Sequence, residues 1–439
     1  MLLASAITAL STHCLGQRIN RVKIDSFLAA LDKHHMAMGS VAISVNGKIS
    51  YQRAFGSRFI GVSGSLPADT ATTYRIGSTT KMFTAVMILQ MVEEGKLRQD
   101  DRLAKFFPGL PNAATITIRQ MLYHRSGLPE YTEPFPDFEQ WMDSATTRAQ
   151  LLQLIAGRKP MFEPGKKTSY CNSNFLVLSY IIERLDKSSY RQCLKKRITD
   201  RLHLVNTYYA APFDSLKNEA LSYAYGRGQW VPQKGTDTSI HQGAGLIVST
   251  PSDLVRFIDA LFNNQLLQPS SLKQMTTWVD HLGMGIFPVD VDGVKGAGHD
   301  GHIEGFRSSL KYFPDTKLAI AYCTNGEVYA KNDLVQALSR VCLDRPQLIP
   351  LFETVAVPDS VLSKYAGEYI NDELGIEVLI TKADTTLIAN VKGNSFNMEP
   401  LANNQFIFRF MGLLFNFDNR NNELIIHETY KSYRLRKRK

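Results

Sequence analysis

The sequence predicts an α+β domain followed by a small all-β domain. In the first 345 residues, strand patterns stand near both ends and helix patterns lie between them, an order that favours α+β. After a proline-rich segment at residues 346–358, short strand patterns separated by turns replace this mixture. We therefore expect a first domain over residues 18–345, a linker over 346–358 and a β domain over 359–439.

The composition is that of a folded protein. Of the 439 residues, 44% are hydrophobic and 21% are charged, which excludes a mostly disordered chain. With 29 glycines and 5 cysteines, collagen-like and disulfide-dense classes are excluded as well. Beyond the N-terminus, no apolar run reaches the roughly 18 residues of a membrane-spanning helix.

The first domain begins with a helix and a hairpin. Apolar residues at helical spacing predict a helix over residues 24–36. Asn46-Gly47, between two strand-like runs, is the strongest short signal for a hairpin. The apolar stretch from Thr79 to Glu94 predicts a long, largely buried helix that ends before Gly95.

The rest of the first domain combines helices, loops and a strand pair. Residues 96–245 mix short helices with glycine- and proline-rich loops. The stretch from Pro251 to Phe262 predicts an amphipathic helix that opens with a proline. Two strands, Ser308 to Phe313 and Leu318 to Thr324, and a closing helix from Asn332 to Leu343 complete the domain.

The second domain shows five strand patterns at the spacing of a small sandwich or barrel. They are Ile376–Thr381, Thr386–Lys392, Gln405–Phe410, Leu414–Asp418 and Leu424–Tyr430. Turn sequences such as Lys392-Gly393-Asn394 separate them.

The N-terminus indicates export. Residues 1–17 are apolar and small, as in the core and tail of a secretory signal peptide, although no basic residues precede them. We expect a periplasmic or extracellular location, and a short buried segment is the alternative. Cleavage near Gln17 leaves four cysteines, whose spacing is not that of a zinc site and assigns no disulfides.

The net charge of +9 is concentrated at the C-terminus. Six of the nine residues from Lys431 to Lys439 are basic and none is acidic. We expect a solvated basic tail after the last strand, with at most a weak contact to an anionic envelope surface. The rest of the chain has only a small net positive charge, which gives no reason to expect nucleic-acid binding.

Ser78 and Lys81 are the candidate nucleophile and base. Ser78 lies where coil gives way to the long helix, so backbone N–H groups and the positive end of the helix dipole are close to it. Lys81 stands three residues on and shares a helix face with Ser78. A lysine in apolar surroundings can lose its proton near neutral pH and then activate a hydroxyl. An N-cap serine beside a surface lysine is the common alternative.

The Ser-x-x-Lys pattern occurs twice more in the chain. Ser270 with Lys273 has the context of a helix cap on a surface turn. Ser308 and Lys311 lie in a predicted strand, where residues three apart point to opposite faces. Among the three serines, Ser78 alone stands between a loop and a buried helix.

Four further segments accompany the Ser78 motif, Arg75–Lys81, along the chain. They are Gln120–Pro129, Tyr170-Cys171-Asn172, Gly243–Leu254 and Gly298–Phe306. In this order the five segments resemble the serine β-lactamase and penicillin-binding-protein superfamily, and class C β-lactamase-like hydrolases in particular. The resemblance covers about residues 20–345. It implies an antiparallel sheet flanked by helices, beside an all-helical lobe.

The start of the second domain has a resemblance of its own. Residues 365–369, Tyr-Ala-Gly-Glu-Tyr, resemble the opening of lipocalin-like domains that are appended to such hydrolases.

In this superfamily, the tyrosine at the position of Tyr170 is the proton shuttle beside the serine. We expect a phenol near Lys81 to be shifted toward phenolate. The resemblance assigns Asn172 to the substrate's acyl-side carbonyl or amide. A buried structural tyrosine is the alternative for Tyr170. The Tyr-x-Asn pattern recurs at Tyr369-Ile370-Asn371, where it starts a predicted strand.

The third family element maps onto His299-Asp300-Gly301. The resemblance places His299 and Gly301 at the substrate, on an edge strand that lines the active site. It also assigns the oxyanion hole to the backbone N–H groups of Ser78 and His302, two donors aimed at a tetrahedral oxygen.

The third element departs from the β-lactamase pattern. No Lys-Thr-Gly is present, and His299 replaces the lysine that favours the carboxylate of a β-lactam. A neutral imidazole does so less well at pH 7. His-x-Gly also occurs at His241 and His281, and a metal pair of His299 with His302 is poorly supported by ligand count.

These residues predict a serine hydrolase without metal or cofactor. The expected reaction forms an acyl-enzyme on Ser78 from an ester or amide, such as a D-amino-acid peptide, a peptidoglycan-type peptide or a small ester. A weak β-lactamase and a non-catalytic penicillin- or peptidoglycan-binding protein are the alternatives.

Overall fold

The computed structural model describes residues 19–438 apart from 63, 136–137, 215, 227–228, 348, 351, 403, 409–412 and 428–431. The expected signal peptide, residues 1–17, lies outside the described residues. Within these ranges, no helix is long and apolar enough to cross a membrane.

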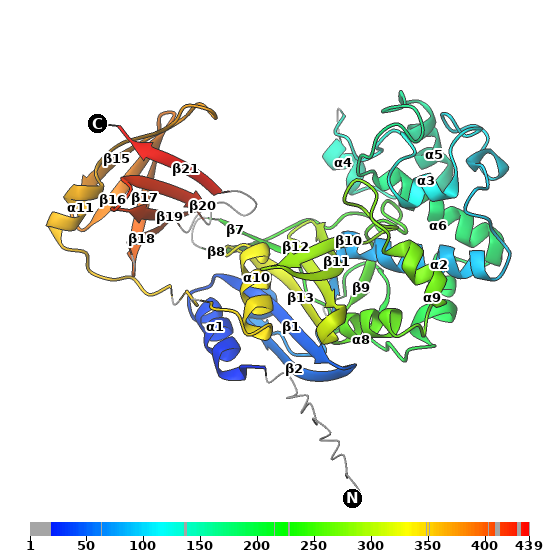
Figure 1. Ribbon diagram of the computed structural model, residues 1–439, viewed down its shortest axis with the longest axis horizontal. Coiled ribbons are helices and arrows are strands. Elements are labelled where there is room, and N and C mark those ends of the chain that lie inside the picture. The colour runs from blue at the N-terminus through cyan, green and yellow to red at the C-terminus, as the bar shows by residue number, and fades with distance from the viewer. Residues whose placement is uncertain are drawn as a thin grey trace, which may run out of the picture.

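A six-stranded antiparallel sheet forms the centre of the first domain (Figure 1). Its strands, in spatial order, are β10 (Phe287–Val291), β11 (Val294–Ile303), β12 (Phe306–Phe313), β13 (Leu318–Glu327), β1 (Ala37–Val45) and β2 (Lys48–Phe55). The predicted hairpin at Asn46-Gly47 is β1-β2, and the predicted strand pair is β12-β13. Both predictions are confirmed.

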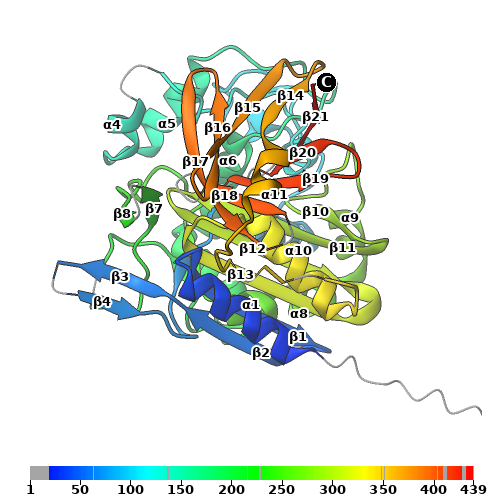
Figure 2. The same cartoon turned by 90° about the vertical axis from the view of Figure 1, so that its left-hand side faces the viewer.

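Helices cover both faces of this sheet (Figure 2). One face packs against α1 (Arg21–Lys33) and α10 (Lys331–Cys342). The other packs against α8 (Pro251–Phe262), which stacks in turn on α2 (Thr80–Glu93) through Phe257 and Phe83, with ring centroids 3.8 Å apart. Strand side chains alternate between the two apolar cores, as the pleat requires.

A helical lobe lies beside the sheet and surrounds α2. Its other helices are α3 (Ile118–Leu122), α4 (Phe138–Met142), α5 (Arg148–Ala156), α6 (Asn172–Asp186), α7 (Tyr190–Leu194) and α9 (Pro269–Met275). The short strands form three small sheets of their own. They are the pair β3 (Ser57–Gly61) and β4 (Gly64–Pro67), the pair β7 (Tyr223–Gly226) and β8 (Gln229–Pro232), and a three-stranded sheet of β5 (Tyr74–Arg75), β9 (Ile247–Ser249) and β6 (Tyr208–Tyr209). The α+β fold predicted from the sequence is confirmed.

The C-terminal domain is a closed eight-stranded barrel preceded by α11 (Asp359–Tyr365). Its strands are β14 (Gly367–Asn371), β15 (Ile376–Ala383), β16 (Thr386–Val391), β17 (Asn394–Leu401), β18 (Gln405–Phe408), β19 (Leu413–Asp418), β20 (Glu423–His427) and β21 (Ser432–Lys437). The predicted all-β domain is therefore present, and it has more strands than the five sequence patterns indicated.

The prediction of a solvated basic tail at the C-terminus is wrong. Ser432–Lys437 is strand β21, which pairs with β20 and with β14 and so closes the barrel. Leu435 is fully buried in the barrel core, while Arg434 and Arg436 point outward to Glu423 and Asp372. The sequence did not indicate this strand, because Leu435 is its one strongly buried residue and charged residues surround it.

Candidate active site

Ser78 lies in a single 3-10 turn, Gly77–Thr79, directly before α2, and it lines a cavity of about 670 Å³. The turn packs against β11, since a Cβ on Gly77 would lie 2.6 Å from the backbone nitrogen of His302. Gly77 also has a φ of +52°, a conformation that favours glycine. The turn that carries Ser78 is thus in direct contact with the backbone of His302, the other expected oxyanion donor.

Neighbouring strands hold this turn in place. Ser308 Oγ donates a hydrogen bond to the carbonyl of Ile76 at 2.7 Å and lies 2.8 Å from Thr79 Oγ1. A Cβ on Gly301 would lie 1.9 Å from the same Ile76 oxygen, so the close approach of β11 requires glycine. Ser308 is fully buried in this role, and the other Ser-x-x-Lys serine, Ser270, is exposed on α9.

Lys81 is completely buried next to Ser78. Its Nζ lies 3.0 Å from Ser78 Oγ, 2.8 Å from Asn172 Oδ1 and 2.7 Å from the Ala244 carbonyl oxygen. Burial lowers the pKa of Lys81 to about 7, although the Glu130 carboxylate acts in the opposite direction. A neutral amine has two N–H donors and one lone pair. With Asn172 and Ala244 accepting the two N–H groups, the lone pair is left for the Ser78 hydroxyl.

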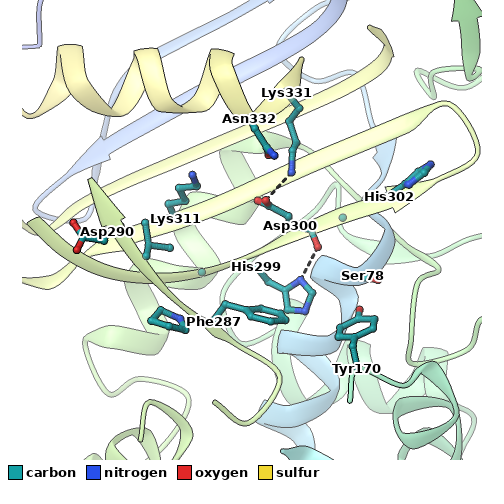
Figure 3. A pocket seen from close by; sticks show the side chains of 14 residues that line it. Ser78, Tyr170, Phe287, Asp290, His299, Asp300, His302, Lys311, Lys331 and Asn332 are labelled. Carbon is teal, nitrogen blue, oxygen red and sulfur yellow. Dashed lines mark hydrogen bonds and ion pairs between the residues drawn. The ribbon is translucent and has the colours of Figure 1, made fainter. Parts of the chain in front are cut away.

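Tyr170 lies over Lys81. It also lines the cavity near Ser78 (Figure 3). Its ring centroid is 4.9 Å from Lys81 Nζ and 4.5 Å from that of His124, on which it stacks. The tyrosine is 38% exposed, so substrate can reach it.

The expected shift of Tyr170 toward phenolate is wrong. Burial raises the pKa of the Tyr170 phenol, and a hydrogen bond with Ser78 only partly opposes this effect. Lys81 does not offset the burial, because its own pKa falls to about 7 and it carries little positive charge above that pH. A protonated Tyr170 can serve only as a proton donor in the resting site, which leaves Lys81 as the candidate base.

Asn172 opens α6 and connects the helical lobe to the base. Its Oδ1 accepts from Lys81 and its Nδ2 donates to Thr132 Oγ1 at 3.2 Å. Its backbone N–H donates to Glu130 Oε2 at 2.5 Å, which places a carboxylate at the positive end of α6. Neither Glu130 nor Thr132 was predicted from the sequence. Their place directly after the Gln120–Pro129 segment was the one available sign.

His124 supports the tyrosine. Its Nδ1 accepts a hydrogen bond from the Cys171 backbone at 3.0 Å, so Nε2 carries the proton. Burial and the nearby Lys81 charge hold the pKa of His124 well below its usual 6.5. A neutral imidazole therefore lies beneath the Tyr170 ring.

His299 lies in strand β11. The predicted strand Ser308–Phe313 belongs to β12, the next strand along the chain. The Nδ1 of His299 is 2.5 Å from the carbonyl oxygen of Asp300, which can only accept, so Nδ1 carries the proton. Nε2 is then an acceptor, and within the described part of the chain it has no hydrogen-bond partner. Burial, with the Lys81 charge, lowers the pKa of His299 to about 3, so the imidazole is neutral. Phe287 meets its ring edge-on at 4.7 Å between centroids.

Strand β11 is an edge over only part of its length. β10 pairs with it from Phe287↔Gly298 to Val291↔Val294, and the residues from His299 onward have no partner strand on that side among the described residues. The backbone next to Ser78 is thus open to substrate.

The structure brings together the seven residues predicted for the site. They are Ser78, Lys81, Tyr170, Asn172, His299, Gly301 and His302. The alternatives have other places: His241 is partly buried behind the site with its Nδ1 2.7 Å from the Tyr131 hydroxyl, His281 is exposed in a turn, and Tyr369 belongs to the barrel. No group of three or more potential metal ligands occurs in the described ranges.

Comparisons with known proteins agree with this geometry. The sequence model of the family described as Beta-lactamase matches residues 24–342. Penicillin-binding protein 4* of Bacillus subtilis (strain 168) is 22% identical over 426 residues, which span 90% of this chain and 92% of that protein.

Solved structures share the fold. The octameric penicillin-binding protein homologue from Pyrococcus abyssi superposes with a TM-score of 0.68 at 22% identity, covering 95% of this chain and 100% of that one. The D-amino acid amidase from Ochrobactrum anthropi SV3, complexed with L-phenylalanine amide, gives a TM-score of 0.63 at 24% identity over 74% of this chain and 99% of that one. The chain belongs to the Beta-lactamase family and, at the level of that family, is a serine hydrolase.

Proposed function

We propose that this protein hydrolyses an ester or amide, such as a D-amino-acid amide, a peptidoglycan-type peptide or a small ester, through an acyl-enzyme on Ser78. The observation that carries the proposal is the hydrogen bonding of Lys81, whose two acceptor partners leave its lone pair to Ser78. The likeness in fold to a D-amino acid amidase supports an amide substrate.

In the first half-reaction, Ser78 Oγ bonds to the substrate carbonyl carbon while its proton passes to Lys81 Nζ. The backbone N–H groups of Ser78 and His302 bind the oxyanion that forms. When the tetrahedral intermediate collapses, the bond to the leaving nitrogen or oxygen breaks. Tyr170 gives that atom its proton and recovers one from Lys81.

In the second half-reaction, water adds to the acyl carbonyl carbon and yields its proton to the neutral Lys81 amine. The bond to Ser78 Oγ then breaks, the acid product leaves, and the serine recovers its proton. No metal or cofactor takes part in this scheme.

The tautomer of His299 argues against efficient turnover of β-lactams. Its Nε2 is an unprotonated acceptor, and its pKa of about 3 keeps it so at neutral pH. A carboxylate is also an acceptor, so the two repel each other where a lysine would attract. Substrates that offer an N–H, ammonium or hydroxyl group to this position suit the site better.

A hydrolysis panel tests the proposal. It compares nitrocefin, a D-Ala-D-Ala peptide, D-amino-acid amides and short-chain p-nitrophenyl esters on the wild-type protein and on Ser78→Ala. We expect turnover of an amide or ester by the wild type, poor turnover of nitrocefin, and no turnover by the variant. A Ser78→Ala protein that hydrolysed p-nitrophenyl acetate at the wild-type rate would refute the mechanism.

Labelling separates the enzyme from a non-catalytic binding protein. A fluorophosphonate should add to Ser78, as intact-protein mass spectrometry can show. A fluorescent penicillin that gives a stable adduct, combined with no turnover of any substrate in the panel, would favour the binding protein.

A further inference from the structure

The cavity at Ser78 continues around the free edge of β11 to the opposite face of the sheet. Successive residues of a strand point to opposite faces. His299 and Gly301 point toward α2 and the catalytic residues, whereas Asp300 points toward α10. Figure 3 shows His299 and Tyr170 on one side of the strand, and Asp300 and Lys331 on the other.

The second side of the cavity is rich in charge. Its charged and amide side chains come from three strands and one helix: Asp290 of β10, Asp300 of β11, Lys311 of β12, and Lys331 with Asn332 of α10. We call these five residues the upper wall.

Three of the four charges of the upper wall are already paired. Lys331 Nζ lies 2.7 Å from Asp300 Oδ2, and its side chain is only 5% exposed. Asp290 Oδ2 lies 2.5 Å from Lys295 Nζ at the surface. The ammonium group of Lys311 makes no hydrogen bond or ion pair with any residue that the structure describes.

A half-buried ammonium without a partner is unfavourable, because it has lost part of its hydration without gaining a counter-ion. Burial accordingly lowers the pKa of Lys311, and the nearby charge of Lys331 acts in the same direction. Asp300 opposes both effects but already has an ion-pair partner of its own. An anion in the cavity would therefore be bound by Lys311 without displacing an existing contact.

We propose that the upper wall is a subsite for an acidic side chain of the substrate, which Lys311 binds as a carboxylate with the Asn332 amide beside it. The inference rests on the proposed function, because it assigns the subsite to the substrate of Ser78. An extended substrate lying along the free edge of β11 sends alternate side chains to the two faces of the sheet. The scissile bond faces Ser78, so the neighbouring side chain faces Lys311.

The side chain in question belongs to the leaving portion. Tyr170 must deliver a proton to the leaving atom, and its ring lies 6.2 Å from that of Phe287 and 6.3 Å from that of His299. Both of those residues line the same cavity as Lys311. The leaving portion therefore extends from Ser78 toward the upper wall.

Two probes test the subsite without any turnover. Acetyl-D-alanyl-D-glutamate amide and acetyl-D-alanyl-D-glutamine amide differ only in the charge of one side chain, and neither has a free terminal carboxylate. Calorimetry on the Ser78→Ala protein should give a Kd about tenfold lower for the glutamate probe, the factor typical of one hydrogen bond to a charged group. The preference should weaken as ionic strength rises.

Two variants in the Ser78→Ala background assign the preference to the upper wall. Lys311→Met should reduce the ratio of the two Kd values to within twofold. Asn332→Asp adds a carboxylate to the upper wall at the N-terminus of α10, where it favours the helix, and should also remove the preference while the protein stays folded. Lys48→Met, at an exposed lysine of β2 on the opposite edge of the sheet, should leave the ratio unchanged.

Equal Kd values for the two probes, or a ratio that survives Lys311→Met, overturn the subsite. The subsite is also contradicted if neither probe binds at millimolar concentration and the same two probes built from L-residues do not bind either. Charge-selective binding in a protein whose wild type hydrolyses nothing would refute the proposed function and keep the subsite. Hydrolysis by the wild type, with no preference between the two probes, would keep the proposed function and refute the subsite.

Discussion

Arg75 and Glu304 form a buried ion pair that joins β5, just before the turn of Ser78, to the β11–β12 turn, just after His302. Arg75 Nη1 lies 2.9 Å from Glu304 Oε1, and the two side chains are 7% and 6% exposed. Both groups also bind the backbone of Thr236, through Glu304 Oε1 at 2.6 Å and Arg75 Nη1 at 3.2 Å. The spacing of the two expected oxyanion donors therefore depends on a side-chain contact outside the cavity.

Glu304→Gln should reduce kcat more than it changes KM. The loss of the carboxylate leaves the buried Arg75 guanidinium without its ion-pair partner, which destabilises the fold by up to about 3–5 kcal/mol. A small displacement of the oxyanion donors can cost on the order of 100-fold in rate. Steady-state kinetics on a p-nitrophenyl ester measures this, and Glu304→Asp should recover part of the rate. An unchanged kcat in a destabilised Glu304→Gln protein would show that the pair supports the fold alone.

Replacement of Lys81 should abolish acylation while leaving the nucleophile in place. Lys81→Arg keeps a cation in the site but cannot supply a lone pair at any working pH. We expect both Lys81→Arg and Lys81→Met to lower the acylation rate by roughly 100- to 10,000-fold, the range for loss of a general base. Stopped-flow measurement of the acylation burst checks this, and a Lys81→Arg protein with wild-type burst rate would contradict the assignment.

The acylation rate should rise with pH and level off above about 7. Lys81 is the base and its folded-state pKa is about 7, so the active neutral form accumulates through that pH. No fall from ionisation of Tyr170 is expected below pH 10, because burial raises the pKa of that phenol. A pH–rate profile under single-turnover conditions tests both points. A rate that falls as pH rises through 7 would contradict them.

The same shift makes stability depend on pH. The pKa of Lys81 is lower in the folded protein than its ordinary 10.5, so between about pH 7 and 10.5 the unfolded chain binds more protons. The free energy of unfolding therefore gains from Lys81 as pH rises through this window, by at most about 1.4 kcal/mol per pH unit. Urea titrations of the wild type and Lys81→Met should show the variant's advantage shrinking toward pH 10. A constant difference would mean that Lys81 is charged in the folded state.

Tyr170→Phe should distinguish between leaving groups. The phenylalanine ring can keep the stacking on His124, so the fold should be unaffected. An amide nitrogen must be protonated to leave, whereas p-nitrophenolate need not be. We expect amide hydrolysis to fall by roughly 100-fold or more and p-nitrophenyl ester hydrolysis by much less. Equal losses for the two substrate types would show that Tyr170 does not protonate the leaving group.

Much of this site could be predicted because its residues lie in short segments with local geometry. Ser78 and Lys81 share one helix turn, and Asn172 opens the next helix after Tyr170. The contact of Arg75 with Glu304 spans 229 positions, and nothing in either local pattern indicates it. Lys311 was identified in sequence only as part of a rejected Ser-x-x-Lys pattern.

Shifts in pKa were predicted in part. A lysine near apolar residues suggested the lowered pKa of Lys81, but the direction for Tyr170 depends on burial that the sequence does not show. Strand β21 was missed for a related reason. Its alternating pattern contains one strongly apolar residue, Leu435, so the many charged residues favoured a solvated tail over a strand.

The order of strands has a consequence for synthesis on the ribosome. In the first domain β1 lies between β2 and β13, so the N-terminal hairpin keeps one unpaired edge until Leu318–Glu327 has been translated. In the barrel, β14 must likewise wait for Ser432–Lys437, the last strand made. Translation that stops before β21 leaves a sheet with two open edges, a template for aggregation. Each domain therefore completes its fold only when its final strand has left the ribosome.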